Sequence, residues 1–436
     1  MHSPHRYLLV GLVVAIGVGT ANAQAFKVGF GKRDITPPKP MPMWGYGDRH
    51  ALLSTGVRDP LHAKAVVIDV GADKLAIVGL DLGRSPMTEM MARIRATVKE
   101  KAGVNYVLMS GSHTHHGPVL ELSDEDGKGK GVFDDGVAYI ESLEGLLVDA
   151  IVEAAGNVQD ARMGWGQADV NMNRNRHTKV EPKPTDPELT VFRFDDAGGK
   201  PIALVVNYSA HPTMLPGEDL RFSAEYPGQM MAAVEKEFDA NCVFMQGAAG
   251  DMSPNRTPET DTIETFGKAL AGHVMEIAKG IETAVPEKPS IQGKDDLFEG
   301  TPRIDFKLPF IQNLFKQAFF PELATRSLDE FGDGKIRPQL TTVLLNGNLA
   351  LIGGSGEFFC NHSNRLKERI RIKTVFFGYC NGHHMYFPTV EGAAEGGYGA
   401  DATVSWVPLG MGERMMDQAI VHIYTMLGNY KLPTGL

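Results

Sequence analysis

Residues 104–118 read VNYVLMSGSHTHHGP, an apolar run followed at once by a loop with three histidines. The run 104–109 predicts a buried strand, and loops at strand ends of α/β proteins collect ligands and catalytic groups. Imidazole binds zinc and titrates near neutrality, so the loop suits both metal ligation and proton transfer. If the extended geometry continues, His113 and His115 point to the same side, one to hold a metal and the other to move protons. By itself, the loop fits a polar turn with incidental histidines equally well.

The same pattern of an apolar strand followed by a polar loop recurs along the chain. Ser85-Pro86 is typical of a helix start, with Ser85 as N-cap and a helix running to Gly103. Asn346-Gly347 predicts a tight hairpin between strands 341–345 and 349–352. We therefore expect an α/β fold with a mixed β-sheet core flanked by helices and a site on loops at strand ends. Further strands are expected at 75–81, 189–194, 202–208 and 242–246, and further helices at 139–155, 226–238 and around 266–277.

Composition and the N-terminus narrow the class of protein. The 436-residue chain carries a formal net charge of −10 and no basic cluster, which argues against a nucleic-acid partner. A charged start, the apolar run 8–18 and Ala21-Asn22-Ala23 are typical of a secretory signal peptide over residues 1–23. We expect one exported domain over 24–436, periplasmic or secreted. The apolar run is too short for a membrane span and no other stretch is apolar enough, so no stable membrane insertion is expected.

Two local features add expectations about structure. Residues 283–335 are richer in Pro, Lys and Asp, which predicts a surface excursion or lid. The chain has three cysteines without CxxC spacing, so a thiolate zinc site is not expected. In an oxidising compartment, Cys360–Cys380 is the first disulfide to test. Three buried free cysteines, with Cys242 as the third, fit the sequence about as well.

Further candidates for chemistry lie in polar loops after predicted strands. His211 offers another imidazole, Glu357 a carboxylate among glycines, and Arg174 a guanidinium that suits an oxyanion. Each also has a purely structural interpretation. His211 fits a hydrogen-bonded polar residue, Glu357 the first turn of a helix, and Arg174 an exposed loop cation. The remaining candidates are Ser253, which also fits a helix cap, and the tyrosine pair Tyr386 and Tyr398 around a glycine-rich stretch.

Several motifs, taken in order, resemble the neutral/alkaline (non-lysosomal) ceramidase family. They are GFGKRDITPP at 29–38, GLDLG at 79–83, SHTHHGP at 112–118, NRNR at 173–176, DPELT at 186–190, GDMSPN at 250–255 and GEF at 356–358. The combination of SHTH-x-GP and GD-x-SPN is specific, and the resemblance covers most of the chain after residue 23.

The resemblance implies one zinc ion per chain, Zn²⁺, with a position left for water. It implies two roles near the metal: His115 as general base, and Arg174 with Tyr398 as groups that stabilise the oxyanion or position the substrate. Ser253 matches a serine considered as a nucleophile, a step that a zinc-activated water makes unnecessary. The implied ligands are His113, His211, Glu357 and Tyr386.

Two departures from the family pattern bear on the substrate. Val119-Leu120 replaces the family's glycines after SHTH-x-GP, and the family's C-terminal β-sandwich domain is not expected here. Both favour an N-acyl substrate that is smaller or more soluble than ceramide. The sequence thus predicts an exported zinc-dependent amidohydrolase. A zinc esterase or lactonase shares the same oxyanion, and a periplasmic ligand-binding protein is the alternative without turnover, which the proton-transfer groups His115 and Glu357 disfavour.

Overall fold

The computed structural model describes residues 25–430, and its first sheet has eight strands in the order β11-β9-β8-β6-β1-β3-β4-β5. The pairs β4–β5 and β9–β11 are parallel and the others antiparallel, which confirms the predicted mixed sheet. The predicted signal peptide lies outside the described residues. The strands are β1 (Lys27–Asp34), β3 (His62–Asp69), β4 (Lys74–Leu80), β5 (Tyr106–Gly111), β6 (Gln159–Asp169), β8 (Glu188–Asp196), β9 (Pro201–Tyr208) and β11 (Asn241–Gln246).

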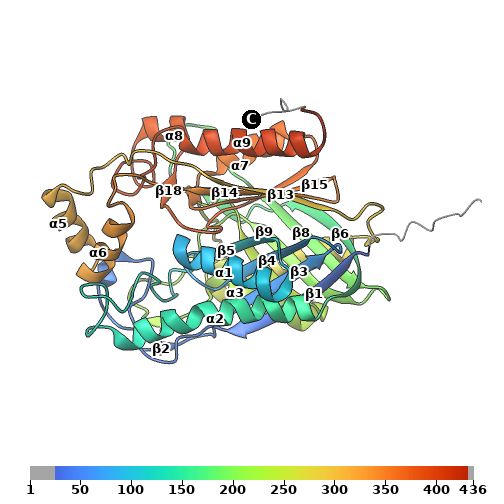
Figure 1. Ribbon diagram of the computed structural model, residues 1–436, viewed down its shortest axis with the longest axis horizontal. Helices are drawn as coiled ribbons and strands as arrows, with labels where there is room; N and C mark the ends of the chain where they lie inside the picture. Colours follow the sequence, from blue (N-terminus) through green and yellow to red (C-terminus); the bar gives the residue numbers. More distant parts are fainter. Residues whose placement is uncertain (1–24, 431–436) are drawn as a thin grey trace, which may run out of the picture.

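A second sheet of four strands stacks on the first (Figure 1). Its strands are β13 (Ile291–Leu297), β14 (Gln339–Leu345), β15 (Leu349–Gly354) and β17 (Lys373–Phe377). The predicted hairpin between β14 and β15 is confirmed: Asn346 and Gly347 have φ of 53° and 68°, as a type I′ turn requires. Because alternate side chains face inward, one apolar layer joins the sheets: Val66, Ile77 and Val243 from the first with Val343, Leu351 and Val375 from the second.

Helices cover the outer faces of both sheets. Their apolar sides pack on the sheets, and Figure 1 shows α9 and α7 over the second sheet and α2 under the first. Helix α1 ends at Gly103, whose φ of 68° confirms the predicted C-terminus. The helices are α1 (Thr88–Ala102), α2 (Asp134–Gly156), α3 (Glu225–Phe238), α4 (Ile263–Lys279), α5 (Pro309–Ala318), α6 (Pro321–Glu330), α7 (Cys360–Arg369), α8 (Val390–Glu395) and α9 (Met411–Met426).

Short elements complete the chain and lie largely around the strand ends. The pairs are β10 with β2, β12 with β7, and β16 with β18. They are β2 (Gly56–Val57), β7 (Asn173–Asn175), β10 (Arg221–Phe222), β12 (Met252–Pro254), β16 (Glu357–Phe358) and β18 (Tyr386–Phe387), with 3-10 turns η1 (Gly47–Arg49) and η2 (Pro258–Thr260). No helix within residues 25–430 is long and apolar enough to cross a membrane.

Two strands of the first sheet approach each other closely and bring three loops together. A Cβ on Gly79 of β4 would lie 2.4 Å from the backbone oxygen of Phe244 in β11, so only glycine fits there. At the end of β11, the Gln246 amide donates to the carbonyls of Ser112 (3.0 Å) and Ala210 (2.9 Å). One side chain therefore joins the loops that follow β5, β9 and β11.

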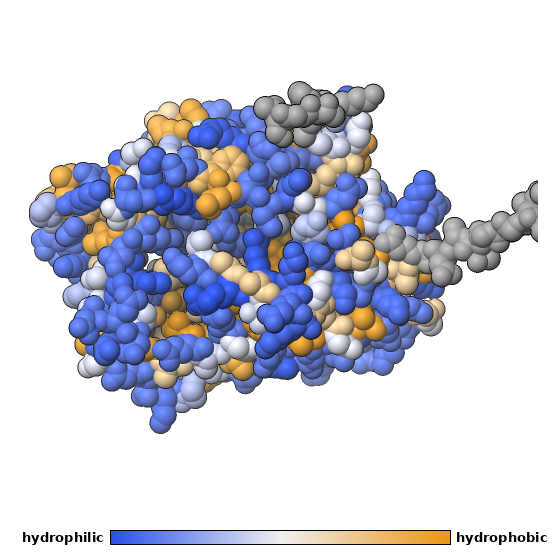
Figure 2. All heavy atoms as spheres, viewed as in Figure 1, coloured by the Kyte–Doolittle hydropathy of each residue, from blue (hydrophilic) through white to orange (hydrophobic). Residues whose placement is uncertain are grey.

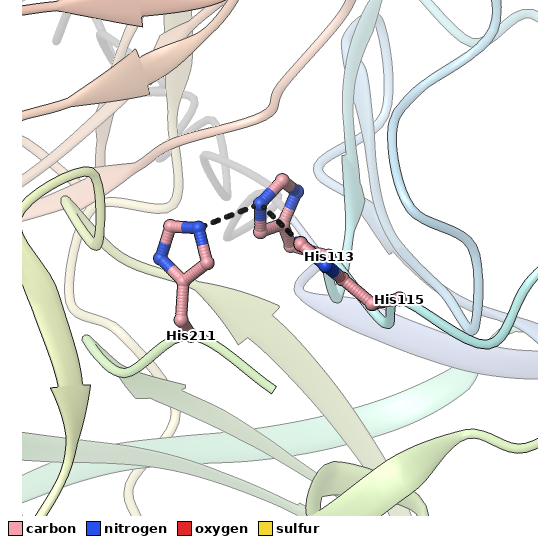
Figure 3. Close-up of side chains that lie close together, drawn as sticks. All are labelled: His113, His115 and His211. Carbon is pink, nitrogen blue, oxygen red and sulfur yellow. Dashed lines mark hydrogen bonds between the residues drawn. The ribbon is translucent and has the colours of Figure 1, made fainter. Parts of the chain in front are cut away.

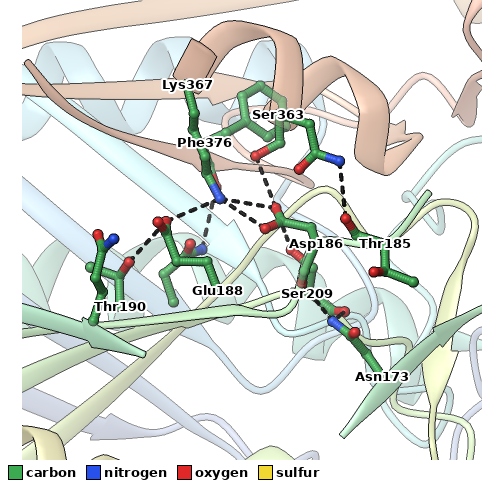
Figure 4. A network of polar contacts seen from close by, with 12 residues as sticks. Asn173, Thr185, Asp186, Glu188, Thr190, Ser209, Ser363, Lys367 and Phe376 are labelled. Carbon is green, nitrogen blue, oxygen red and sulfur yellow. Dashed lines mark hydrogen bonds and ion pairs between the residues drawn. The ribbon is translucent and has the colours of Figure 1, made fainter. Parts of the chain in front are cut away.

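A buried ion network fastens the second sheet to the first (Figure 4). Lys367 Nζ of α7 lies 2.9 Å from Asp186 Oδ1 and 3.1 Å from Glu188 Oε1. Lys373 Nζ of β17 lies 3.0 Å from the same Glu188 oxygen, and the Ser363 hydroxyl donates to Asp186. The DPELT motif thus acts as a structural joint.

One sequence prediction about structure is wrong, the choice between a disulfide and three free cysteines is decided, and the stretch 283–335 is divided. Helix α1 starts after Met87, because the Ser85 hydroxyl donates to the Met109 carbonyl (2.7 Å) and does not cap the helix. Cys360 and Cys380 form no disulfide: all three cysteines are free and buried. The stretch 283–335 is not a continuous excursion, because β13 pairs along its whole length with β14.

Candidate metal and active site

His113 and His211 face each other where the loops after β5 and β9 meet (Figure 3). His113 has a φ of 69°, so the extended geometry does not continue into the loop as expected. The bend nevertheless keeps His115 beside His113, with 3.4 Å between their Nε2 atoms. The three imidazoles together form a group whose ligand atoms lie within 4.8 Å of one another.

The hydrogen bonds of His113 and His211 fix which nitrogen faces the centre of the group. Each ring donates its Nδ1 proton to a backbone carbonyl, His113 to Gly83 (2.8 Å) and His211 to Ala249 (2.6 Å). Burial lowers the pKa of His211 to about 3, so its ring is neutral at pH 7. A neutral ring with a proton on Nδ1 presents a lone pair on Nε2. Backbone-anchored imidazoles of this kind are typical of metal ligands.

Glu357 completes this centre with a buried carboxylate. Its Oε2 lies 3.3 Å from Nε2 of both His113 and His211 and has no hydrogen-bond partner among the described residues. Two imidazole lone pairs and an unsatisfied carboxylate oxygen thus converge, an arrangement that a cation satisfies. The donor set fits a metal ion.

Tyr386 reaches the same centre through strand pairing. Parallel strands β16 and β18 place Tyr386 directly beside Glu357, and its ring lies parallel to that of His211 with 6.5 Å between centroids. Burial and the charge of Glu357 raise the pKa of Tyr386 well above its ordinary value. The structure therefore brings together the four ligands that the resemblance implies.

His115 lies at the edge of the centre and faces the cavity. Its Nδ1 has no hydrogen-bond partner among residues 25–430, and the rings of Trp44 and Tyr46 pack edge-on against it. Burial, with the neighbouring His113 and His211, lowers the pKa of His115 well below its ordinary value. A neutral imidazole in this place is able to accept a proton. The same geometry allows it to bind a metal, so position alone does not separate the two roles.

Arg176, and not Arg174, reaches the centre, which corrects the sequence prediction. Its Nη2 lies 2.9 Å from His211 Nε2 and donates to the Tyr386 hydroxyl (3.1 Å) and the Gly250 carbonyl (2.9 Å). Arg174 lies exposed in β7, opposite Ser253 of β12. The motif NRNR contains Asn-Arg twice, so the sequence offered both arginines and no means of choosing between them.

Ser253 and Tyr398 differ in their relation to the cavity beside the histidines. Ser253 is half-buried in β12 and is not among the residues that line the cavity next to the histidines. Tyr398 does line that cavity, although it is 66% exposed, and its ring contacts Tyr386 edge-on with 5.6 Å between centroids. Tyr398 is therefore placed to touch a bound molecule, whereas Ser253 is not.

A cavity of about 380 Å³ opens onto the centre and has two kinds of wall. Helices α5 and α6 and the turn between them supply apolar side chains, and Val119 belongs to the wall whereas Leu120 is buried in the core. Sequence reasoning missed the polar wall, although Arg84 and Glu121 lie just beyond the GLDLG and SHTHHGP motifs. The principal lining residues are Trp44, Arg84, His113, His115, Val119, Glu121, Phe315, Phe319, Phe320, Leu323, Glu330, Glu357, His383, Tyr386, Tyr398 and Trp406.

Comparisons with known proteins agree with this arrangement. The neutral ceramidase of Pseudomonas aeruginosa is 26% identical over 361 residues, covering 74% of this chain and 49% of that protein. The neutral ceramidase of Drosophila melanogaster is 25% identical over 282 residues, covering 57% of this chain and 38% of that protein. The chain thus spans half or less of the length of these curated relatives.

Solved structures show the same fold. A structure titled as a ceramidase complexed with C2 superposes with a TM-score of 0.72 at 19% identity, covering 95% of this chain and 77% of that one. The crystal structure of neutral ceramidase from Pseudomonas aeruginosa gives a TM-score of 0.71. A sequence model described as neutral/alkaline non-lysosomal ceramidase, N-terminal, matches residues 26–266. Because that match covers more than half of the chain, the protein belongs to the neutral/alkaline non-lysosomal ceramidase family.

Proposed function

We propose that the protein is an exported, zinc-dependent amidohydrolase that cleaves an N-acyl compound, with one zinc ion per chain. The observation that carries the proposal is the convergence of His113 Nε2, His211 Nε2 and the unsatisfied Glu357 Oε2. A mixed set of imidazole and oxygen donors suits zinc, whereas magnesium and calcium prefer oxygen donors alone. His113, His211, Glu357 and Tyr386 would hold the ion.

The side chains around this centre divide the work of amide hydrolysis. A zinc ion bound there supplies Lewis-acid chemistry, which polarises a carbonyl and makes water more acidic. His115, neutral at pH 7, takes a proton from the attacking water and returns it to the leaving amine. Arg176 and Tyr398 donate hydrogen bonds to the oxygen that becomes negative as the carbonyl is attacked. Ser253, outside the cavity lining, has no covalent role.

The cavity supports a lipid-like N-acyl substrate. The curated relatives are named neutral ceramidases, and the apolar wall from α5 and α6 offers a surface for an acyl chain. Val119 narrows the cavity beside the histidine loop, and a narrower cavity favours a short or medium acyl chain. Residues 309–330 would then cover part of the site, because Phe315, Phe320 and Leu323 line the cavity.

The test uses the full chain and measures metal and turnover separately. We expect about one zinc per chain by mass spectrometry, hydrolysis of N-acyl amides, loss of activity with a chelator and recovery with zinc. Glu357→Gln should lose zinc and turnover together. The control His273→Ala removes an exposed histidine of α4 and should retain both. Zinc-free protein with full activity, or hydrolysis of esters alone, would contradict the proposal.

Export is tested independently of the chemistry. We expect the chain expressed with residues 1–23 to appear in the periplasm or medium, with Gln24 as its new N-terminus. Retention of Met1–Ala23 in an intracellular product would overturn this part of the proposal.

A further inference from the structure

Part of the cavity wall carries a buried charge that the proposed hydrolysis does not use. Arg84 and Glu121 are 6% and 4% exposed, and Arg84 Nη1 donates to Glu121 Oε1 at 2.7 Å. The second Glu121 oxygen accepts from the Leu120 N–H (2.8 Å), so this carboxylate is fully engaged. Arg84 Nε donates to the Ser85 carbonyl (3.3 Å), but Nη2 has no partner among the described residues.

His383 lies between this charged wall and the metal centre. Its side chain is 1% exposed, it lines the cavity, and neither ring nitrogen has a hydrogen-bond partner among residues 25–430. Its Nε2 lies 3.6 Å from Glu357 Oε1, the oxygen that does not face His113 and His211. An unpartnered buried imidazole costs free energy, which a ligand polar group recovers when it binds.

The two walls of the cavity differ sharply in chemistry. Phe319, Phe320, Leu323 and Trp406 form an apolar surface, whereas Arg84 Nη2 and the His383 ring have no hydrogen-bond partner among the described residues. A molecule that fills the cavity therefore needs both an apolar part and a polar part. With an acyl chain on the apolar wall, the amine half of the substrate meets Arg84 and His383.

We propose that Arg84 and His383 form a subsite for a carboxylate on the amine half of the substrate, so that the preferred substrates are N-acyl amino acids. Glu121 and the Ser85 carbonyl hold Nη1 and Nε and fix the orientation of the guanidinium, which leaves Nη2 to donate to an oxyanion. Glu330, the last residue of α6, also lines the cavity, and burial raises its pKa to about 7, so below pH 7 it is mostly protonated and repels a carboxylate less than an ionised acid does. The subsite rests on the proposed function, whose substrate class it names.

Two probes with the same acyl chain test the subsite. N-lauroylglycine carries a carboxylate where N-lauroylethanolamine carries a hydroxymethyl group. A charged hydrogen bond predicts that kcat/KM for the glycine conjugate is higher by about tenfold to a hundredfold. The double variant Arg84→Met/Glu121→Gln removes the buried pair without leaving one charge alone. It should bring the ratio of the two kcat/KM values to within about twofold of one, mainly through KM of the carboxylate substrate.

The matched control removes an exposed arginine–glutamate pair. Arg93 of α1 and Glu144 of α2 lie 2.8 Å apart, and Arg93→Met/Glu144→Gln should leave the ratio unchanged. Equal kcat/KM values in the unmodified protein, or the same ratio in the Arg84 double variant, would overturn the subsite. If neither probe is hydrolysed, the proposed function fails, and calorimetric affinities of the two probes for the protein and the double variant still decide the subsite.

Discussion

Arg176 Nη2 lies 2.9 Å from Nε2 of His211, the ring nitrogen that also faces Glu357. The guanidinium is anchored by the Gly250 carbonyl, and the backbone N–H of Arg176 donates to the Asp251 carbonyl (2.8 Å). In the proposed hydrolysis, a cation held in this way does not have to be reorganised when negative charge develops on the substrate carbonyl.

Arg176→Ala should therefore lower kcat/KM by roughly 10²–10³-fold, as expected for the loss of one positioned donor to an oxyanion. Bound metal should remain, because the arginine supplies no ligand atom. Steady-state kinetics and metal analysis on the same preparation measure both quantities. Arg174→Ala, from the same motif but exposed, is the matched control and should stay within about twofold. Equal losses of kcat/KM in the two variants would show that Arg176 does not stabilise the oxyanion.

Alanine variants of the three histidines should differ in the amount of metal they bind. His113→Ala and His211→Ala should empty the site, because both rings present Nε2 to Glu357. His115→Ala should keep the metal and lose turnover by ~10²–10⁴-fold, the range for a positioned general base. Metal analysis with turnover on the same samples distinguishes these outcomes. If His115→Ala loses metal in parallel with activity, His115 is a ligand and another group is the base.

Ser253→Ala should retain appreciable activity. The serine lies on β12 opposite Arg174 and outside the cavity lining, so no covalent ester is expected to form on it. Turnover of the variant, together with mass spectrometry of the protein during turnover, measures this. An acyl adduct on Ser253 would replace direct attack by water with a two-step mechanism.

Glu330 should make stability depend on pH. Burial raises the pKa of this carboxyl to about 7, above its ordinary value of 4.5. Its contribution to stability is therefore fully present below about pH 4.5 and is lost as pH rises through about 7, because the folded state binds the extra proton in that window. Glu330→Gln removes this loss. At pH 8 the variant should be more stable than the unmodified protein by up to about 3 kcal/mol.

Urea unfolding at pH 5, 6, 7 and 8 measures this dependence on Glu330. The difference between Glu330→Gln and the unmodified protein should grow with pH across the series. Glu259→Gln, an exposed acid on η2, is the control and should show no such trend. A difference that is flat from pH 5 to 8 would contradict the raised pKa.

Lys367→Met should destabilise the protein without changing its chemistry. The substitution leaves Asp186 buried without its cation and leaves Glu188 with Lys373 alone (Figure 4). Breaking a buried pair in this way costs roughly 3 kcal/mol. Thermal unfolding measures the loss, and Lys279→Met at the exposed end of α4 is the control. Stability within about 0.5 kcal/mol of the control would show that the network is not a joint between the sheets.

The hydropathy of the molecular surface does not indicate where the functional site lies. The face in Figure 2 is mostly hydrophilic, with hydrophobic side chains in separate patches. Such a pattern is ordinary for a protein surface and points to no site. The candidate site residues lie instead in loops at strand ends, and residue type and spacing predict such loops from the sequence.

Local sequence patterns predict the strands β4, β5, β8, β9, β11, β14 and β15 and most of the helices that pack on them. Apolar periodicity, Gly103 and Asn346-Gly347 specify these elements through local backbone preferences. The candidate metal ligands can also be identified from the sequence, because they lie in loops or short strands next to predicted strands. They are His113, His211, Glu357 and Tyr386. Sequence patterns predict a feature correctly where the interactions that cause it lie within one segment of the chain.

Which of these side chains lie in contact depends on the tertiary structure. Tertiary packing joins loops far apart in the sequence through the close approach of β4 and β11 at Gly79, and it places Arg176 and not Arg174 beside His211. It also decides that Ser85 bonds a distant carbonyl instead of capping a helix. Partner choice of this kind depends on packing between segments that are not adjacent in the sequence, and no pattern within one segment encodes it.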